Sequence, residues 1–296
     1  MQSSLNKPMW ILLAVVASVS AGFTSVLSKL GGSKIGSNML TLLRTIVVVM
    51  MSWLIVALFG SWGNVGGHSL LFLILSGLAT GASWLCYYRA LQIGKVAGVV
   101  AVDQSSVLFS VILAIIFLGE RSKFEITLIG LLIIALGMFF IVLERNKNID
   151  KTVVVKTQRG WIFFAFGSAI FASLTAIFGK IGISGVDSNL GTAIRTLVII
   201  PMALMMVFIN HETQDYQKLT GRDILYIVLS GIGTGVSWLC YYAALALGPV
   251  TVIAPIDKTS IAVATFLAFL FLREKPSRLT ILGLGFIVFG TIVIAF

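Results

Sequence analysis

The chain has 296 residues, of which 58% are hydrophobic and 11% are charged, and its mean hydropathy is +1.05. These values exclude an ordinary soluble domain and predict an all-α integral membrane protein, because membrane-spanning helices satisfy their backbone hydrogen bonds internally. The net charge of +10 comes from lysines and arginines scattered among short polar segments. We therefore expect the lipid bilayer as a partner, and no nucleic acid.

Apolar stretches long enough to cross the hydrocarbon core, which takes about 20 helical residues, recur along the whole sequence. The short polar segments between them contain no phosphate-binding GxxxxGK[ST] motif of the kind that ATP-driven pumping needs. We predict ten transmembrane helices, in chain order at residues 9–30, 38–59, 69–91, 97–118, 124–143, 161–182, 189–209, 223–247, 250–272 and 278–296.

The first predicted helix, residues 9–30, resembles a secretory leader, because a basic residue precedes an apolar run that ends in small residues. Its internal copy argues against cleavage: Trp10 and Lys29 recur as Trp161 and Lys180, 151 residues later. We therefore expect residues 9–30 to remain as a helix. Each lysine ends its helix, where a long side chain can anchor the helix at the interface.

The second helix of each copy carries an asparagine and an arginine, Asn38 with Arg44 and Asn189 with Arg195. An arginine stays charged, so inside a membrane it needs a carboxylate, backbone carbonyls or water. Two interpretations stay open at this point. Either an Arg–Asp clamp holds each repeat together, or these residues bind an anionic substrate.

The third helices contain an exact repeat, Ser-Trp-Leu-Cys-Tyr-Tyr, at residues 83–88 and 237–242. Its aromatic side chains either line a ligand cavity or form an interfacial belt, and the mid-helix position favours the cavity for about half of the tyrosines. These residues are Trp84, Tyr87, Tyr88, Trp238, Tyr241 and Tyr242. Glycine pairs precede both runs, in residues 76–81 and 230–235, and predict either a fixed packing seam or a sliding surface.

The fourth helices carry Asp103 and Asp257 about seven residues from their start, which is roughly 10 Å deep. Charge at such a depth is expensive and predicts a proton-exchanging or substrate-binding carboxylate, with a structural ion pair as the alternative. Pro255 and Lys258 occur only in the second copy, so an interrupted helix and unequal roles are expected. Glu120 and Glu274 close the fourth helices, where we expect solvated charges.

The repeats divide the chain into residues 1–143, a charged linker at 144–160, and residues 161–296. Five spans is an odd number, so the second repeat enters the membrane inverted relative to the first, a 5+5 inverted-topology repeat. With both termini outside the cell, 14 of the 21 lysines and arginines lie near cytoplasmic helix ends, against 4 in the opposite orientation. Loop charge therefore favours external termini.

Enzymatic motifs are missing from the sequence. It has no nucleophile elbow, no paired histidines and no metal-ligand cluster, and His68 and His211 lie in predicted loops. We predict a protein that is not an enzyme and that uses no metal or other cofactor.

Two features resemble a known family: the glycine-rich fifth helices and the ends of the predicted fourth helices. Those ends read Phe-Leu-Gly-Glu-Arg at 117–121 and Phe-Leu-Arg-Glu-Lys at 271–275. Over nearly the whole chain the sequence resembles the EamA type of the drug/metabolite transporter superfamily. Its second half is similar in particular to the short single-repeat members. The resemblance implies secondary active transport in the cell membrane, often export of amino acids or other small metabolites, and termini in the cytoplasm.

We therefore expect a multi-pass cell-membrane transporter that alternates access around a cleft between helices one to four and six to nine. Helices five and ten support this unit or dimerise it, so the protein is a monomer or a homodimer. Asp257 is the predicted coupling residue for a small-molecule substrate, and Lys258, Arg195 and Arg44 set the local charge. The alternatives are a carrier of lipid-linked substrates, similar to a flippase or scramblase, and a non-transporting membrane scaffold.

Overall fold

The computed structural model describes residues 2–93, 96–121, 124–147, 160–273 and 275–296. Regular structure in these ranges is entirely helical. The elements are α1 (Gln2–Gly31), α2 (Ser37–Phe59), α3 (Gly67–Ile93), α4 (Val96–Gln104), α5 (Ser106–Phe117), α6 (Phe124–Lys147), α7 (Trp161–Gly182), α8 (Ser188–Ile209), η1 (Asp215–Lys218), α9 (Gly221–Leu247), α10 (Val250–Lys258), α11 (Ser260–Leu272) and α12 (Arg278–Ala295).

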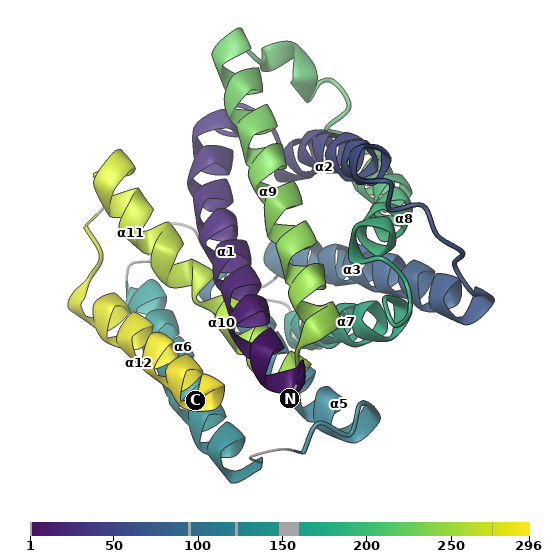
Figure 1. Ribbon diagram of the computed structural model, residues 1–296. Coiled ribbons are helices and arrows are strands. Elements are labelled where there is room, and N and C mark those ends of the chain that lie inside the picture. Colours follow the sequence, from purple (N-terminus) through teal and green to yellow (C-terminus); the bar gives the residue numbers. More distant parts are fainter. Residues whose placement is uncertain (1, 94–95, 122–123, 148–159, 274) are drawn as a thin grey trace.

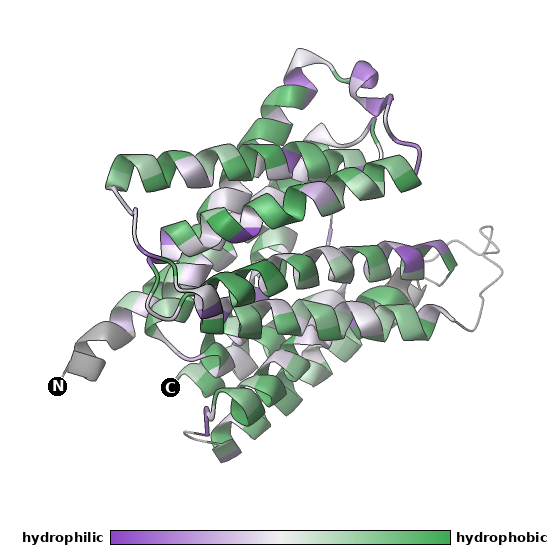
Figure 2. Cartoon of the chain, turned by 90° about the vertical axis from the view of Figure 1, so that its right-hand side faces the viewer, coloured by the Kyte–Doolittle hydropathy of each residue, from purple (hydrophilic) through white to green (hydrophobic). Residues whose placement is uncertain are grey.

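Ten segments of the described chain are long and apolar enough to span a membrane, and their bounds differ from the predicted ones by a few residues at most. The fourth span joins α4 to α5 over Gly98–Phe117, and the ninth joins α10 to α11 over Val250–Leu272. Large apolar side chains stay exposed on the outer helix faces, for example Leu58 at 71% and Phe163 at 79%. Figure 2 shows that most helix residues are hydrophobic and that hydrophilic residues gather mainly in loops and near helix ends. The protein is a multi-pass membrane protein.

The two repeats interleave instead of forming separate bundles. The most extensive helix contacts all join the halves: α3 with α7, α1 with α9, and α6 with α12. Figure 1 shows α1 running beside α9 and α3 beside α7. The first helix of each repeat thus packs on the third helix of the other, so any cavity between these helices is lined by both repeats.

Glycines bring backbones together at the points where the buried arginines lie. A Cβ added to Gly77 would lie 2.8 Å from the carbonyl oxygen of Arg195, and one added to Gly231 would lie 3.2 Å from that of Arg44. The absence of a side chain lets α3 approach α8, and α9 approach α2, more closely than larger residues allow. The packing seam predicted from the glycine pairs therefore brings together the third helix of one repeat and the second helix of the other.

Both fourth helices are broken, at equivalent places. Ser105 separates α4 from α5, and Thr259 separates α10 from α11. In each break the hydroxyl donates back to a carbonyl three residues earlier, Ser105 to Val102 and Thr259 to Ile256. The interruption expected in the copy that contains Pro255 is present, and the other copy, which has no proline there, is interrupted as well. The shared feature is a hydroxyl that competes for the backbone carbonyl, a known cause of helix distortion.

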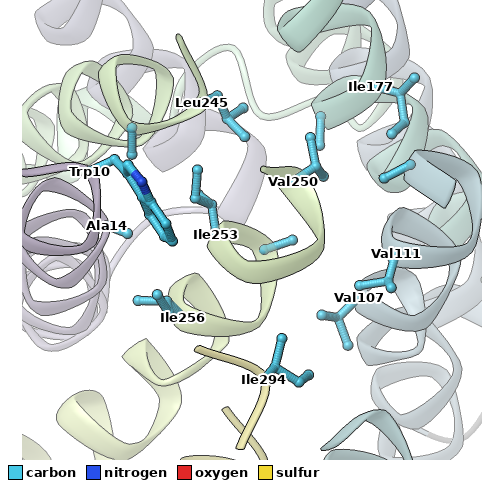
Figure 3. Packing of buried hydrophobic residues seen from close by; sticks show 14 of the residues in the cluster. Trp10, Ala14, Val107, Val111, Ile177, Leu245, Val250, Ile253, Ile256 and Ile294 are labelled. Carbon is cyan, nitrogen blue, oxygen red and sulfur yellow. The ribbon is translucent and has the colours of Figure 1, made fainter. Parts of the chain in front are cut away.

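Helix α10 lies in the main apolar core and is fixed from several sides. Its Val250, Ile253 and Ile256 are at most 5% exposed. Figure 3 shows them among side chains from other elements, including Trp10 of α1 and Val107 of α5. Burial on this scale holds the short helix rigidly, and with it Asp257 near its end.

The fifth helix of each repeat packs on its counterpart through small residues. A Cβ on Gly137 would lie 2.5 Å from the carbonyl oxygen of Gly283, and one on Gly130 would lie 2.8 Å from that of Gly290. Helices α6 and α12 therefore form a close intramolecular pair, side by side in Figure 1. Whether this pair also dimerises the protein remains a prediction.

Candidate functional site

A cavity of about 290 Å³ lies between helices of both repeats, α1 and α3 of the first and α7 to α10 of the second. Its lining combines aromatic rings, hydroxyl groups and two charged side chains. The lining residues are Ala21, Thr80, Ser83, Trp84, Ala172, Thr175, Ala176, Arg195, Ser237, Trp238, Tyr241, Tyr242 and Asp257. We call this the central cavity.

Arg195 is the most deeply buried charged group in the central cavity, at 2% exposed. It crosses to the opposite repeat, where Nη2 donates to Thr80 at 2.9 Å and Nε donates to Ser76 at 3.3 Å. Its Cζ lies 4.3 Å from the ring centre of Tyr242 and 5.1 Å from that of Trp238. The charge is therefore stabilised by hydroxyl dipoles and aromatic faces instead of a carboxylate.

One donor of this guanidinium is left over. Arg195 Nη1 is buried and has no hydrogen-bond partner among the described residues. A buried donor without a partner costs about 1–3 kcal/mol, so such groups call for an explanation. An anionic ligand in the central cavity would satisfy it.

Asp257 lines the same cavity from the end of α10. Its carboxylate makes no ion pair and no hydrogen bond with the part of the chain that the structure describes. Arg195 and Asp257 thus share a cavity without neutralising each other. The Arg–Asp clamp is wrong for Arg195, because it forms no ion pair within the described residues.

A second cavity, of about 180 Å³, adjoins the central one, because Trp84 and Trp238 line both. We call it the Arg44 cavity. Arg44 Nη2 donates to Thr234 at 3.1 Å, which repeats the bond from Arg195 to Thr80. The clamp is wrong here too, since Arg44 forms no ion pair within the described residues. The other lining residues are Thr41, Thr45, Val48 and Tyr88.

Asp103 has a different environment from Asp257. Its Oδ1 accepts a hydrogen bond of 2.6 Å from the hydroxyl of Ser168 on α7. Ser168 in turn lies 3.3 Å from the hydroxyl of Ser83 on α3. Asp103 is not among the residues that line either cavity. In this repeat the carboxylate ties three helices together.

Several predicted site residues lie away from both cavities. Tyr87 packs in an apolar cluster with Ala90 and Val99, whereas the other three tyrosines line a cavity. Lys258 follows Asp257 at the end of α10 but does not line the central cavity. Asn189 lies at the start of α8, where Nδ2 donates to Ser61 at 3.4 Å.

Asn38 is held in a different contact, with the loop after α8. Its Nδ2 donates to Glu212 at 2.7 Å, and the other oxygen of Glu212 accepts from the backbone N–H of Met39 at 2.7 Å. Asp215 accepts from the backbone N–H of Gly36 at 2.7 Å. The hydrogen bond from Lys218, followed by the one from Gly36, lowers the pKa of the Asp215 carboxyl. These carboxylates cap the N-terminus of α2.

Two charged helix ends have partners that the sequence did not reveal. Glu120, expected to be solvated, accepts hydrogen bonds from the backbone N–H groups of Val250 and Thr251, at 2.9 and 2.8 Å. Lys180, expected to be an interfacial anchor, donates to the carbonyls of Leu245 and Gly248. They therefore cap the start of α10 and the end of α9, which favours both charges. Glu274 lies outside the described residues.

The hydroxyl partners of the arginines were missed. Thr80 accepts a hydrogen bond from Arg195, and Thr234 accepts one from Arg44. Both threonines lie inside the two glycine segments, which were interpreted as a packing seam or a sliding surface and not as arginine partners. The available signal was that Ser76 and Thr80 recur as Ser230 and Thr234. No three His, Cys, Asp or Glu side chains of the described ranges converge as a metal site requires.

These features define a class of protein: a polytopic membrane protein whose inverted repeats enclose polar cavities beside buried arginines, an arrangement suited to moving a small solute. The sequence profile of the EamA-like transporter family matches residues 8–143 and 159–296, once in each repeat. The chain belongs to this family. The family indicates a membrane transporter rather than an enzyme.

Two further proteins are similar to this chain. A protein of Sinorhizobium sp, described as an uncharacterized transporter in the cobO 3'region, is 40% identical over 138 residues, which are 47% of this chain and 98% of that protein. It is about as long as one repeat. A protein of known crystal structure shares 15% identity with a TM-score of 0.79, over 97% of this chain and 96% of that one. That second likeness concerns the fold alone.

Proposed function

We propose that the protein is a secondary active transporter that exports a small amino-acid-like metabolite by alternating access, coupled to proton movement. The observation that carries the proposal is the central cavity, in which Arg195 has an unsatisfied donor and Asp257 has no partner. A zwitterion satisfies both groups, its carboxylate at the guanidinium and its ammonium at the carboxylate. Export follows the resemblance to the EamA type.

The aromatic lining indicates what lies between the two charges of the ligand. Trp84, Trp238 and Tyr241 provide apolar faces around the cavity. Such faces favour an amino acid with an apolar or planar side chain over a sugar, whose hydroxyl groups need more hydrogen-bond partners. The substrate class we propose is therefore an apolar, zwitterionic amino acid.

Proton coupling follows from the single carboxylate. Asp257 lies about 10 Å into its span, where a lone negative charge is expensive. It is stabilised either by a proton or by the ammonium group of the substrate, and not by both together. Substrate binding therefore releases a proton, and release of substrate on the other side takes one up.

A ligand screen on purified protein tests the proposal. We would measure the thermal stability of the protein with phenylalanine, phenylethylamine, 3-phenylpropanoate and glucose at two pH values, since ligands of the native state raise its apparent stability. Phenylalanine should give the largest shift, and Arg195→Gln and Asp257→Asn should each abolish it. A shift from glucose alone, or a phenylalanine shift that both variants retain, would contradict the proposal.

One observation favours a second candidate, the carrier of lipid-linked substrates. A cavity of about 440 Å³ lies between α1, α4, α6, α11 and α12, and most of its lining is apolar, including Val26, Met138 and Ile261. An acyl or isoprenoid chain fits such a lining. Proteoliposomes with a fluorescent lipid and a membrane-impermeant quencher test this candidate. Quenching no faster than in protein-free vesicles would exclude it.

A further inference from the structure

The Arg44 cavity repeats the chemistry of the central one. The guanidinium-to-threonine bond occurs in both, at 3.1 Å for Arg44 with Thr234 and at 2.9 Å for Arg195 with Thr80. A tyrosine from the repeated hexapeptide lines each cavity, Tyr88 in one and its counterpart in the other. The duplication has therefore produced two arginine sites, each built from the second helix of one repeat and the third helix of the other.

The two cavities differ in charge. The central cavity contains Asp257 as well as its arginine. Among the residues lining the Arg44 cavity there is no carboxylate, and Tyr88 is the other titratable group. Arg44 Nε is buried without a hydrogen-bond partner in the described part of the chain. An always-charged group with an unused donor attracts an anion, and no carboxylate lines this cavity to pair with an ammonium group.

The two arginines also lie toward opposite sides of the membrane. Helix α2 starts after one span and α8 starts after six, so these helices enter from opposite sides. Arg44 and Arg195 each lie seven residues beyond the start of their helix, about 10 Å deep. Trp84 and Trp238 form the wall that both cavities share. A ligand that crosses the protein thus meets one arginine on each side of the tryptophan pair.

We propose that Arg44 forms a second carboxylate-binding site, which binds the carboxylate of the substrate alone, on the opposite side of the Trp84–Trp238 pair from the central cavity. This inference rests on the proposed function for the identity of the substrate. The anion moves from one guanidinium to the other as the substrate passes the tryptophans. Selection for an amino group occurs only in the central cavity, where Asp257 lies.

Titration calorimetry on the purified full-length protein tests the second site with two probes, 3-phenylpropanoate, which lacks an amino group, and phenylalanine. Arg44→Gln should lower the affinity for 3-phenylpropanoate about tenfold or more, which is the loss expected for one charge-assisted contact. It should change phenylalanine binding less than about threefold. Asp257→Asn should lower the affinity for phenylalanine and leave that for 3-phenylpropanoate nearly unchanged. The control Arg222→Gln removes an exposed arginine at the start of α9 and should change neither affinity.

The outcomes separate this inference from the proposed function. Unchanged 3-phenylpropanoate binding in Arg44→Gln, or no binding by the wild-type protein, overturns the second site and leaves the central one standing. Arg44-dependent binding of 3-phenylpropanoate without any binding of phenylalanine supports the second site and contradicts the amino-acid substrate. If Arg44→Gln does not fold, Arg44→Lys keeps the charge but loses the Nε donor, and it should still weaken 3-phenylpropanoate. Equal affinity in Arg44→Lys and wild type would then overturn the inference.

Discussion

Asp103 and Asp257 occupy the same position in the two repeats, each two residues before the break in its fourth helix, and differ in what surrounds them. Ser168 donates to Asp103. The residue equivalent to Ser168 in the first repeat is Ala17, which has no hydroxyl group. The same carboxylate is thus a structural hydrogen-bond acceptor in one repeat and an unpartnered group beside a cavity in the other. The two roles thus accompany a side-chain difference between the duplicated helices, a serine in α7 and an alanine in α1.

The largest effect should come from neutralising the free carboxylate. Asp257→Asn should lower transport about 10- to 100-fold, because it removes a charge-assisted contact with the substrate. It should also remove the dependence of transport on a proton gradient. Asp103→Asn is the matched control, with transport changed less than about twofold. Uptake of radiolabelled phenylalanine into proteoliposomes measures both, and equal loss in the two variants would refute the division of roles.

The next largest effect concerns the buried arginine of the central cavity. Arg195→Met should lower the affinity for phenylalanine about tenfold. The melting temperature should stay the same or rise, because burying a charge without a carboxylate partner does not favour the folded state. A structural clamp would behave in the opposite way. Calorimetry and a thermal melt on the same sample distinguish the two. A fall of several degrees with unchanged affinity would show that Arg195 mainly holds the repeats together.

A smaller effect should follow from making the repeats alike. Ala17→Ser introduces, on the fully buried face of α1, the hydroxyl that Ser168 supplies in the other repeat. If it bonds to Asp257 as Ser168 bonds to Asp103, transport should fall about three- to fivefold, the size expected for one competing hydrogen bond. Ala17→Val tests added bulk without a donor. Equal rates for Ala17→Ser and wild type would mean that the missing hydroxyl does not explain the difference.

Much of the fold followed from local patterns in the sequence. Span lengths are set by the bilayer, and the offsets that match Trp10 to Trp161 and Arg44 to Arg195 predicted the inverted repeats. The break at Ser105 was not predicted, because a hydroxyl that bonds back to the helix is no different in sequence from one that faces a neighbour. The pairing of α1 with α9 depends on packing between repeats, which single-helix patterns do not contain.

The sequence predicted which charged residues form the candidate site, but it did not predict their hydrogen-bond partners. Burial is costly for Arg195 and Asp257 wherever they lie in a span, so their residue types alone marked them. Their neighbours depend on contacts between distant segments. Ser168 reaches Asp103 across 65 positions and Glu212 reaches Asn38 across 174. For that reason the structural alternative for Asp103 was left open without its partner, and Asn38 was assigned to the cavity instead of to a helix cap.

The smallest effect concerns a second difference between the repeats, the capping of their second helices. Helix α8 starts at a local cap, Asp187, whereas α2 is capped by Glu212 and Asp215 from a distant loop. Hydrogen bonds from Lys218 and Gly36 lower the pKa of Asp215, so the stability it contributes is present above about pH 4, its ordinary value, and is lost as pH falls through the lowered value. Asp215→Asn should lower the melting temperature by about 1 °C at pH 7, because its ion pair with Lys218 lies at the surface, and by progressively less as the pH falls below about 4. Thermal melts of both proteins across this range give the difference, and a difference that persists at the acid end would show that the carboxylate charge is not what caps α2.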